Sequence, residues 1–251
     1  MTADPVSVDR LYNDPALVRF YDLENAGGAD IDCCRRLAAD AGSVLDLGCG
    51  TGVLAASLGA TREVVGVDPA GAMLHVARAR AGGGRVTWIE ADARGVRLGR
   101  RFDLVVLTGH AFQVFLTDED QRAVLTTIAA HLAPDGRFIF DARNPLVEEW
   151  REWTPQASRR RFEDPELGTI KAWNDVTHDP KTGIVTYKTH YLALASRQQW
   201  SASSQIRFTG RESLQRRLDE AGLAADQWLG DWSAAPYAAA SPEIIPVGRL
   251  R

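Results

Sequence analysis

The sequence predicts an α/β protein built on a doubly wound sheet of seven strands, with an antiparallel β insert after the fifth strand. Up to Pro145, short apolar runs alternate with segments in which apolar residues recur at helical spacing. Runs without polar alternation are typical of parallel strands that are buried on both faces. After Pro145, three longer strand-like segments follow one another without a helix between them, which is typical of antiparallel pairing.

Five strands are expected before the insert, and each is short and apolar. They occupy residues 43–47, 63–67, 86–89, 102–107 and 137–140. The helix before the fifth strand has clear boundary signals. Thr117 can cap its first turn, with Asp120 three residues on, and the sequence Pro-Asp-Gly at residues 134–136 is expected to end it. Two further helices are expected at residues 30–39 and 70–81.

The second part of the chain is read from turn and cap signals. The strands expected in the insert are residues 169–176, 184–194 and 199–208. Residues 179–183 form a hairpin turn between the first two. Thr209 and Glu212 are expected to form a capping box for a helix that ends at Gly222. Residues 225–232 and 243–250 are expected as the last two strands, paired with each other.

These elements suggest three segments. The expected division is residues 1–145 as the ligand-binding core with an N-terminal helical segment, residues 146–208 as an insert that caps the substrate, and residues 209–251 as the rest of the core.

Composition narrows the class of protein. The net charge of −4 argues against a nucleic-acid partner, which usually requires a basic surplus. The three cysteines suggest neither a disulfide framework nor a zinc site, so we expect no metal. No apolar run approaches the ~20 residues of a membrane span. We therefore expect a cytoplasmic protein without membrane contact, either a monomer or a homodimer.

The turn after the first strand carries the main functional signal. Its glycines, Gly48, Gly50 and Gly52, allow a sharp bend and a close backbone approach to a ligand. In a doubly wound sheet, ligands bind at the carboxyl ends of the strands. A dinucleotide fingerprint would need a different spacing of the third glycine, and position 53 is Val. Asp46 would repel a pyrophosphate but attract a sulfonium ligand that carries an amino group. These features favour S-adenosylmethionine over NAD.

Two further carboxylates fit such a ligand. Asp68 ends the second strand, where a carboxylate can accept hydrogen bonds from both ribose hydroxyls. Asp92 follows the third strand and could accept from an adenine amino group, while the backbone amides of Ala91 or Ala93 meet the ring nitrogens. Met73 could supply an apolar face for the adenine. The structural alternative for both aspartates is a helix cap.

Together these features resemble the class I S-adenosylmethionine-dependent methyltransferase family. The segments similar to its motifs are residues 44–52, 65–68, 91–93, 102–106 and 132–137. The resemblance implies a Rossmann-like strand order of 3-2-1-4-5-7-6 with strand 7 antiparallel. It also implies S-adenosylmethionine as the methyl donor and S-adenosylhomocysteine as the product. The residues expected at the cofactor are Tyr21, Asp46, Gly48, Cys49, Gly50, Gly52, Asp68, Pro69, Met73, Ala91, Asp92, Ala93 and Thr108.

Within that family the chain resembles bacterial methyltransferases of amines, amino sugars or hydroxylated metabolites. The resemblance rests on the segment Phe20-Tyr21-Asp22 and on the β insert. It implies a small-molecule acceptor that is methylated on O or N, with Tyr21 lining the cofactor pocket. His110, after the fourth strand, is the candidate general base, and the alternative is a residue that only lines the pocket. The candidate substrate contacts are Phe112, Gln113, Trp173 and His190.

Three alternatives remain open from the sequence. A nucleotide-linked oxidoreductase is disfavoured by Asp46 and Val53. A non-catalytic S-adenosylmethionine-binding protein would share every motif. An RNA or protein methyltransferase is disfavoured by the acidic balance and by the fourth strand, which lacks the Asn/Asp-Pro-Pro-Tyr/Phe sequence of amide and nucleobase enzymes. The basic run at residues 159–161 is interpreted as a solvated loop or strand edge.

Overall fold

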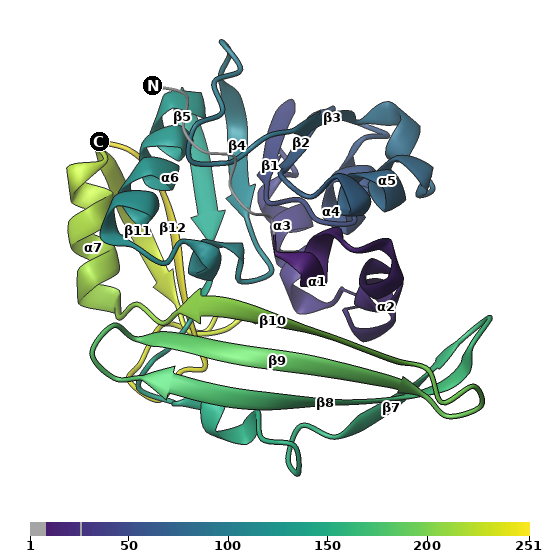
Figure 1. The fold of residues 1–251 in the computed structure, drawn as a ribbon. Helices are drawn as coiled ribbons and strands as arrows, with labels where there is room; N and C mark the ends of the chain where they lie inside the picture. Colours follow the sequence, from purple (N-terminus) through teal and green to yellow (C-terminus); the bar gives the residue numbers. More distant parts are fainter. Residues whose placement is uncertain (1–8, 26) are drawn as a thin grey trace, which may run out of the picture.

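The computed structural model describes residues 9–25 and 27–251. The strands of its larger sheet are β1 Ser43–Leu47, β2 Glu63–Asp68, β3 Thr87–Glu90, β4 Phe102–Leu107, β5 Leu132–Phe140, β11 Leu223–Leu229 and β12 Glu243–Leu250, with the two-residue β6 Ala142–Arg143 beside β12. Their order is β11-β12-β5-β4-β1-β2-β3 (Figure 1). Strands β1 to β5 pair in parallel, whereas β12 is antiparallel to both β5 and β11. The predicted α/β fold and strand order are confirmed.

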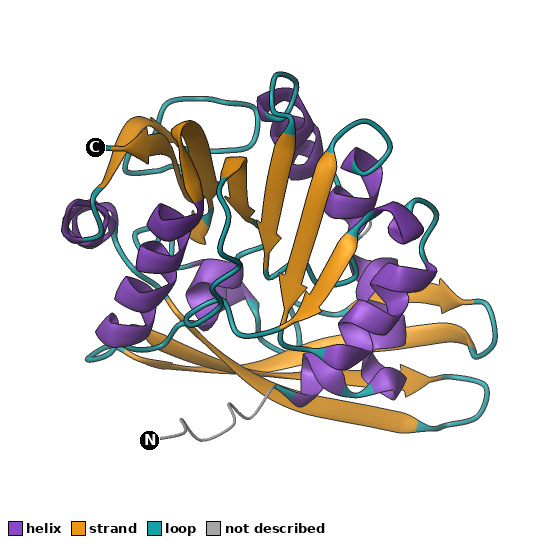
Figure 2. Cartoon of the chain, turned by 90° about the horizontal axis from the view of Figure 1, so that it is seen from above, coloured by secondary structure: helices purple, strands orange, loops and turns teal. Residues whose placement is uncertain are grey.

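Helices cover both faces of this sheet (Figure 2). They are α3 Ala29–Leu37, α4 Val53–Leu58, α5 Gly71–Ala79, α6 Asp118–His131 and α7 Arg211–Glu220. The apolar sides of α6 and α7 pack with one face of the central strands, and those of α3 and α4 pack with the other. This double cover explains why β1 and β4 are buried at nearly every position. Within the described residues, no helix has the length and apolarity needed to cross a membrane.

A second, four-stranded sheet is antiparallel and lies across the lower part of Figure 1. Its order is β10-β9-β8-β7, and the strands are β7 Arg160–Asp164, β8 Gly168–Asp179, β9 Ile184–Ala193 and β10 Gln199–Arg207. The turn between β8 and β9 forms as expected, with Gly183 at a φ of +71° and the Asp179 carboxylate accepting from the N–H of Lys181. The sequence predicted three strands. It missed β7, which begins inside the basic run.

The N-terminal helices α1 Arg10–Asn13 and α2 Pro15–Glu24 connect the two sheets. Pro15 begins α2, and the Asp14 carboxylate caps it by accepting from the N–H of Ala16. Phe20 is fully buried, and its ring lies 4.5 Å from that of Tyr191 in β9. The other face of the α1–α2 segment packs near α5 of the core. This segment therefore fixes how the antiparallel sheet sits over the core.

Two predicted helix boundaries are wrong. Thr209 does not cap α7, whose N-cap is Gly210, because the Thr209 hydroxyl is instead buried in a hydrogen bond with the Gln121 side chain. Helix α6 begins at its Thr117 cap as expected but ends at His131, and β5 starts at once with Leu132. The Pro-Asp-Gly sequence therefore lies within the irregular start of β5, where the register against β4 shifts.

Replacing Phe20 with alanine tests the connection between the sheets. We expect Phe20→Ala to lower the free energy of unfolding by about 3–5 kcal/mol, because it leaves a cavity among aromatic rings. Urea unfolding followed by circular dichroism measures the change. The control is Leu23→Ala in the same helix, where the side chain is 37% exposed and little should be lost. Equal losses in both variants would contradict the assigned role of Phe20.

Candidate active site

The Gly-rich turn leaves β1 in a conformation that depends on glycine. Gly48, Gly50 and Gly52 all have φ values between +52° and +74°. A Cβ at Gly52 would lie 2.4 Å from the Trp88 ring, so this residue also permits close packing. Gly50 is less crowded than Gly52, because the nearest atom to a Cβ at Gly50 would be the Tyr21 hydroxyl oxygen at 4.0 Å. The backbone of the turn can therefore approach a ligand that lies beside the Tyr21 hydroxyl.

Asp68 at the end of β2 supports this turn directly. One carboxylate oxygen accepts from the N–H of Gly50 at 2.8 Å, and the other accepts from the N–H of Ala70 at 2.8 Å. Burial raises the pKa of Asp68, although these two amides counteract the shift. The helix cap expected as the structural alternative does not form, because the N-cap of α5 is Ala70, which has no side-chain cap, and Asp68 accepts from the N–H of that residue. Each oxygen still has a second lone pair, so these hydrogen bonds do not prevent the carboxylate from accepting ribose hydroxyls.

Asp46 lies beneath the turn and is almost completely buried, at 3% exposure. Burial, and to a lesser extent the charge of Asp68, raise the pKa of Asp46 to about 7. The backbone N–H of Ala55 in α4 only partly offsets this effect. An ionised Asp46 therefore costs free energy in the free protein, and a cationic ligand nearby would recover part of that cost.

The N-terminal helix α2 closes over the same turn. Asp22 accepts a hydrogen bond from the Thr51 hydroxyl at 2.6 Å and forms an ion pair with Arg80. Arg80 in turn donates to the backbone carbonyl of Thr51 at 2.9 Å. Burial raises the pKa of Tyr21 to about 12, and Asp68 and Asp22 add to the shift, so its hydroxyl stays protonated as a donor. The Tyr21 hydroxyl thus lies close to the Gly-rich turn.

The other candidate cofactor residues surround the ends of β2, β3 and β4. Met73 is 2% exposed and packs with Val18 and Ala70, which leaves little of its side chain for a ring to contact. The Asp92 carboxylate accepts from the backbone N–H of Arg94 at 2.8 Å and binds its guanidinium. The helix cap expected as the alternative for Asp92 is wrong, because a turn and not a helix follows it; the carboxylate holds that turn through Arg94. The remaining candidates Cys49, Pro69, Ala91 and Thr108 are half-buried, and Ala93 is buried.

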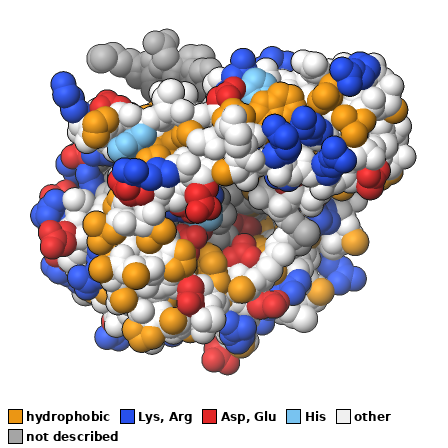
Figure 3. Space-filling model, turned by 90° about the horizontal axis from the view of Figure 1, so that it is seen from below, with side chains coloured by type: hydrophobic (Ala, Val, Ile, Leu, Met, Phe, Trp, Pro, Cys, Tyr) orange, Lys and Arg blue, Asp and Glu red, His pale blue; other side chains and the backbone are white. Residues whose placement is uncertain are grey.

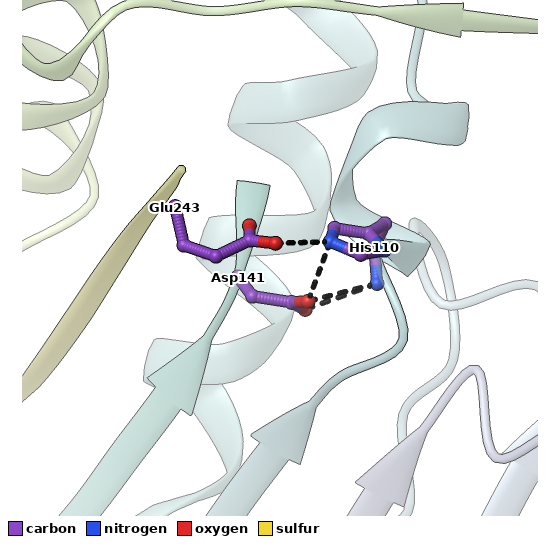
Figure 4. A group of neighbouring side chains, drawn as sticks. All are labelled: His110, Asp141 and Glu243. Carbon is purple, nitrogen blue, oxygen red and sulfur yellow. Dashed lines mark hydrogen bonds and ion pairs between the residues drawn. The ribbon is translucent and has the colours of Figure 1, made fainter. Parts of the chain in front are cut away.

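His110 belongs to a compact cluster with two acids that the sequence analysis did not select. Its Nε2 lies 2.9 Å from Glu243 Oε1 and 3.4 Å from Asp141 Oδ2, and its backbone N–H donates to both oxygens of Asp141 at 3.1 Å (Figure 4). The three residues come from the loop after β4, the end of β5 and the start of β12. Each of the three side chains offers one possible ligand atom, and these atoms lie within 4.8 Å of one another, so the cluster could also hold a metal ion. Burial raises the pKa of Asp141 to about 6.

The cluster adjoins the Gly-rich turn. A Cβ at Gly48 would lie 3.0 Å from the Cβ of Ala111, the residue after His110. Figure 3 shows a hollow in the surface of the molecule with acidic side chains inside it. Asp46, Asp68 and Asp141 all lie at the carboxyl ends of parallel strands, so they share one edge of the sheet. A site of this charge suits a cationic ligand and repels a pyrophosphate.

The candidate substrate residues are less accessible to a substrate than expected. Phe112 is fully buried and stacks on Phe140 at 4.6 Å, so it belongs to the core. Gln113 is also fully buried, where it accepts from Arg143 and donates to the carbonyl of Arg207. Both residues are therefore part of the packing beneath the site and do not line it.

Trp173 and His190 stack on each other across β8 and β9, with ring centroids 5.0 Å apart. Their neighbours Ala172 and Tyr191 are buried against α2. Because successive side chains of a strand point to opposite faces, Trp173 and His190 lie on the outer face of the antiparallel sheet, away from the core. Their sequence-based role as substrate contacts finds no support in this position.

Sequence reasoning missed two members of the His110 cluster and did not decide which face of the antiparallel sheet is the inner one. Tyr187 lies on the inner face, and its hydroxyl hydrogen-bonds that of Tyr12 at 2.9 Å. Asp141 directly follows β5, as Asp46 and Asp68 mark the ends of β1 and β2, so the same strand-end signal could have identified it. Glu243 carries no such signal, because it begins an antiparallel strand.

Comparison with known proteins agrees with this architecture. Residues 44–136 match the model of a family described as a methyltransferase domain. The chain is 28% identical over 214 residues to the cypemycin N-terminal methyltransferase of a Streptomyces species, covering 83% of each chain. It is 29% identical over 231 residues to the dTDP-3-amino-3,6-dideoxy-alpha-D-glucopyranose N,N-dimethyltransferase of Streptomyces fradiae, covering 84% of each.

Solved structures share the fold at lower sequence identity. The CcbJ methyltransferase from Streptomyces caelestis superimposes with a TM-score of 0.75 at 21% identity, covering 92% of this chain and 95% of that one. A S-adenosylmethionine-dependent methyltransferase from Clostridium acetobutylicum gives 0.78 at 16% identity, covering 92% and 96%. With these matches, the chain is similar over most of its length to S-adenosylmethionine-dependent methyltransferases, and it shares their fold.

Asp46→Asn should stabilise the ligand-free protein in a pH-dependent way. The pKa of Asp46 in the fold, about 7, lies above its unfolded value of about 3.9. Its stabilising contribution is therefore complete below about pH 4 and is lost as the pH rises through 7. We expect the variant's gain in unfolding free energy to grow from near zero at pH 4 to at most about 4 kcal/mol at pH 8.

Urea unfolding at several pH values measures this gain. Asp40→Asn, at an exposed carboxylate, is the control and should show no such trend. A gain in Asp46→Asn that does not change with pH would contradict the buried-charge explanation.

Asp68→Ala should weaken the binding of S-adenosylmethionine by roughly 1.5–3 kcal/mol, because hydrogen bonds to a charged acceptor are lost. Isothermal titration calorimetry measures the affinity. Since Asp68 also holds Gly50, Asp68→Asn serves as a second variant that keeps one acceptor oxygen and should lose less. Unchanged affinity in both variants would exclude Asp68 from the ribose site.

Proposed function

We propose that this methyltransferase methylates an amine nitrogen of a small molecule. The observation that carries the proposal is the cluster of His110, Asp141 and Glu243, which adjoins the Gly-rich turn and is strongly acidic. An acidic pocket attracts a cationic amine, and the imidazole can take up its proton. Of the two relatives compared over most of their length, one is named an N-terminal methyltransferase and the other an N,N-dimethyltransferase, which supports nitrogen as the acceptor atom.

The cofactor assignments of the sequence analysis form part of the proposal. S-adenosylmethionine, when bound, supplies a methyl group already activated by the sulfonium. Asp68 would accept from the ribose hydroxyls, Tyr21 would cover the ligand above Gly50, and Asp46 would balance its positive charge. Asp92 is still proposed to accept from the adenine amino group, but Arg94 already binds its carboxylate and competes for the same oxygens. The other cofactor candidates keep their proposed places around the strand ends.

The protein's contribution to the reaction is alignment, exclusion of water and transfer of one proton. Helix α2 covers the turn through Asp22, Thr51 and Arg80. Such a cover restricts water and holds the donor in place. His110 is 23% exposed, so it can reach an acceptor and later release a proton to solvent. We assign to it the role of general base.

The antiparallel sheet is proposed to cap the acceptor with its inner face. That face carries Tyr187 and the buried Thr189, and Tyr12 of α1 meets it. Hydroxyl groups at these positions can hydrogen-bond a polar small molecule. We propose no nucleic-acid or membrane partner, a cytoplasmic setting and a monomer or homodimer, as the acidic composition and the free cysteines of the described chain suggest.

A paired acceptor panel tests the function. The purified protein is incubated with S-adenosylmethionine labelled on the methyl group, and with amines and alcohols that share the same carbon skeletons. We expect label to pass to the amines and S-adenosylhomocysteine to form in equal amount. Transfer to the alcohols alone would overturn the choice of nitrogen. Tight binding of the donor without transfer to any acceptor would favour the non-catalytic binding protein.

His110→Ala should lower turnover by about a hundredfold or more, because a positioned general base typically contributes at least that factor. Binding of S-adenosylmethionine should remain unchanged, since the imidazole is held by Glu243 and Asp141 and is assigned no contact with the donor. Steady-state kinetics and calorimetry on the same preparation separate the two effects. Full turnover in the variant would reduce His110 to a residue that lines the pocket.

A further inference from the structure

The orientation of the His110 ring is fixed from two sides. The residue adopts a φ of +61°, which is uncommon for a side chain with a Cβ. Its backbone N–H donates to both oxygens of Asp141, and its Nε2 faces Glu243 and Asp141. Asp141 is 1% exposed and Glu243 is 13% exposed, so neither acid can turn freely into solvent. A strained backbone held by such contacts is typical of functional sites.

The two carboxylates determine which ring nitrogen carries the hydrogen. An ionised carboxylate only accepts hydrogen bonds, so Nε2 must be the protonated nitrogen when it faces Glu243 at 2.9 Å. In a neutral imidazole the other nitrogen, Nδ1, then holds the free lone pair. None of the hydrogen bonds found within residues 9–25 and 27–251 uses Nδ1. The nitrogen that can accept a proton is therefore the one that the cluster leaves available.

The charge of the cluster favours a cationic acceptor. With a neutral imidazole, Asp141 and Glu243 together carry two negative charges at a buried position. Other ionisable groups that interact with Asp141 are Arg143 of β6, which is paired with Glu149, Tyr21 of α2 and Cys34 of α3. Glu243 Oε2 is buried and has no hydrogen-bond partner within the described chain. An ammonium group placed here would gain both a countercharge and an acceptor oxygen.

We propose that Glu243 and Asp141 are positioning residues that hold His110 as the Nε2–H tautomer, so that Nδ1 deprotonates an acceptor amine that enters the site as an ammonium ion. This inference rests on the proposed function and adds the proton's route and the protonation state of the substrate. The acceptor N–H bond breaks, its proton moves to Nδ1 and its electron pair stays on nitrogen. That pair then forms the bond to the methyl carbon while the carbon–sulfur bond breaks, and its electrons remain on sulfur.

The charge of the cluster after proton transfer explains why two carboxylates are useful. After the proton transfer, the imidazolium is flanked by two negative charges, and the cluster keeps a net charge of −1. The proton then leaves through the exposed edge of His110. A lone imidazole would have no such countercharge and no fixed tautomer.

The pH profile of the wild-type enzyme gives the first test. With an alkyl amine whose pKa is near that of lysine, about 10.4, we expect kcat/KM to be flat from about pH 8 to pH 9.5, because the reacting ammonium form of the substrate stays in excess over this range. A neutral amine that reacts without a base would instead give a kcat/KM that rises tenfold per pH unit across this range. That slope would overturn the proposal.

The variant Glu243→Gln gives the second test. It keeps the shape of the side chain but can donate to Nε2 and so allow the wrong tautomer. We expect kcat to fall about ten- to a hundredfold, because part of the imidazole then carries its hydrogen on Nδ1 and cannot act as the base. Glu243→Asp should recover part of the rate. Asp141→Asn should act in the same direction, and calorimetry with S-adenosylmethionine checks that the donor site of each variant is intact.

A matched control exists on the outer face of the antiparallel sheet. There Asp175 pairs with His190 at 2.7 Å, which is the same kind of histidine–carboxylate contact away from the core. Asp175→Asn should leave both kcat and the pH profile unchanged. Unchanged kinetics in Glu243→Gln would overturn this inference while leaving the proposed function intact, whereas absence of transfer to any amine in the wild type would overturn the proposed function itself.

A metal ion is the competing occupant of the cluster. Activity that disappears with a chelator and returns with Mg²⁺ or Mn²⁺ would assign the three side chains to a cation and overturn the proton route. Turnover that is unaffected by a chelator supports it.

Discussion

Buried carboxylates at one edge of a parallel sheet are the constraint on which this molecule depends. Asp46, Asp68 and Asp141 each lie where a parallel strand delivers its carboxyl end, and burial raises the pKa of all three. Backbone amides offset only part of that cost, as at Asp68. The free protein therefore carries electrostatic strain that cationic ligands relieve. This is a physical reason for the same edge to receive both a sulfonium donor and an ammonium acceptor.

The remaining structure can be understood as a cover for that edge. Helix α2 reaches the Gly-rich turn through Asp22 and Tyr21 and reaches the antiparallel sheet through Phe20. One helix thus couples the cover of the donor to the position of the sheet that faces the acceptor. The Arg19–Asp164 ion pair at 2.6 Å strengthens the second contact, because Asp164 is buried.

The donor half of the site could be predicted because its parts are local. A strand, a Gly-rich turn and a helix follow one another within residues 43–58, and Asp68 ends the next strand, so spacing alone brings them together. The Thr117 cap and the hairpin at Gly183 were predictable for the same reason. Thr209 shows the limit of local signals. Its hydroxyl suited a cap, but burial beside Gln121 gave it a better partner.

The sequence by itself determined the fold class, the strand order through a family resemblance, and the edge of the sheet that binds the donor. Only the tertiary structure decided the acceptor half. Glu243 is 133 residues from His110 in the sequence, and Asp141 is 31 residues from His110. No rule of sequence spacing operates over such separations. The two faces of the antiparallel sheet were likewise undecided, because alternation shows that Trp173 and Tyr187 differ in face from their neighbours but not which face the core covers. Packing of α2 settled that choice and placed Tyr187 inside and Trp173 outside.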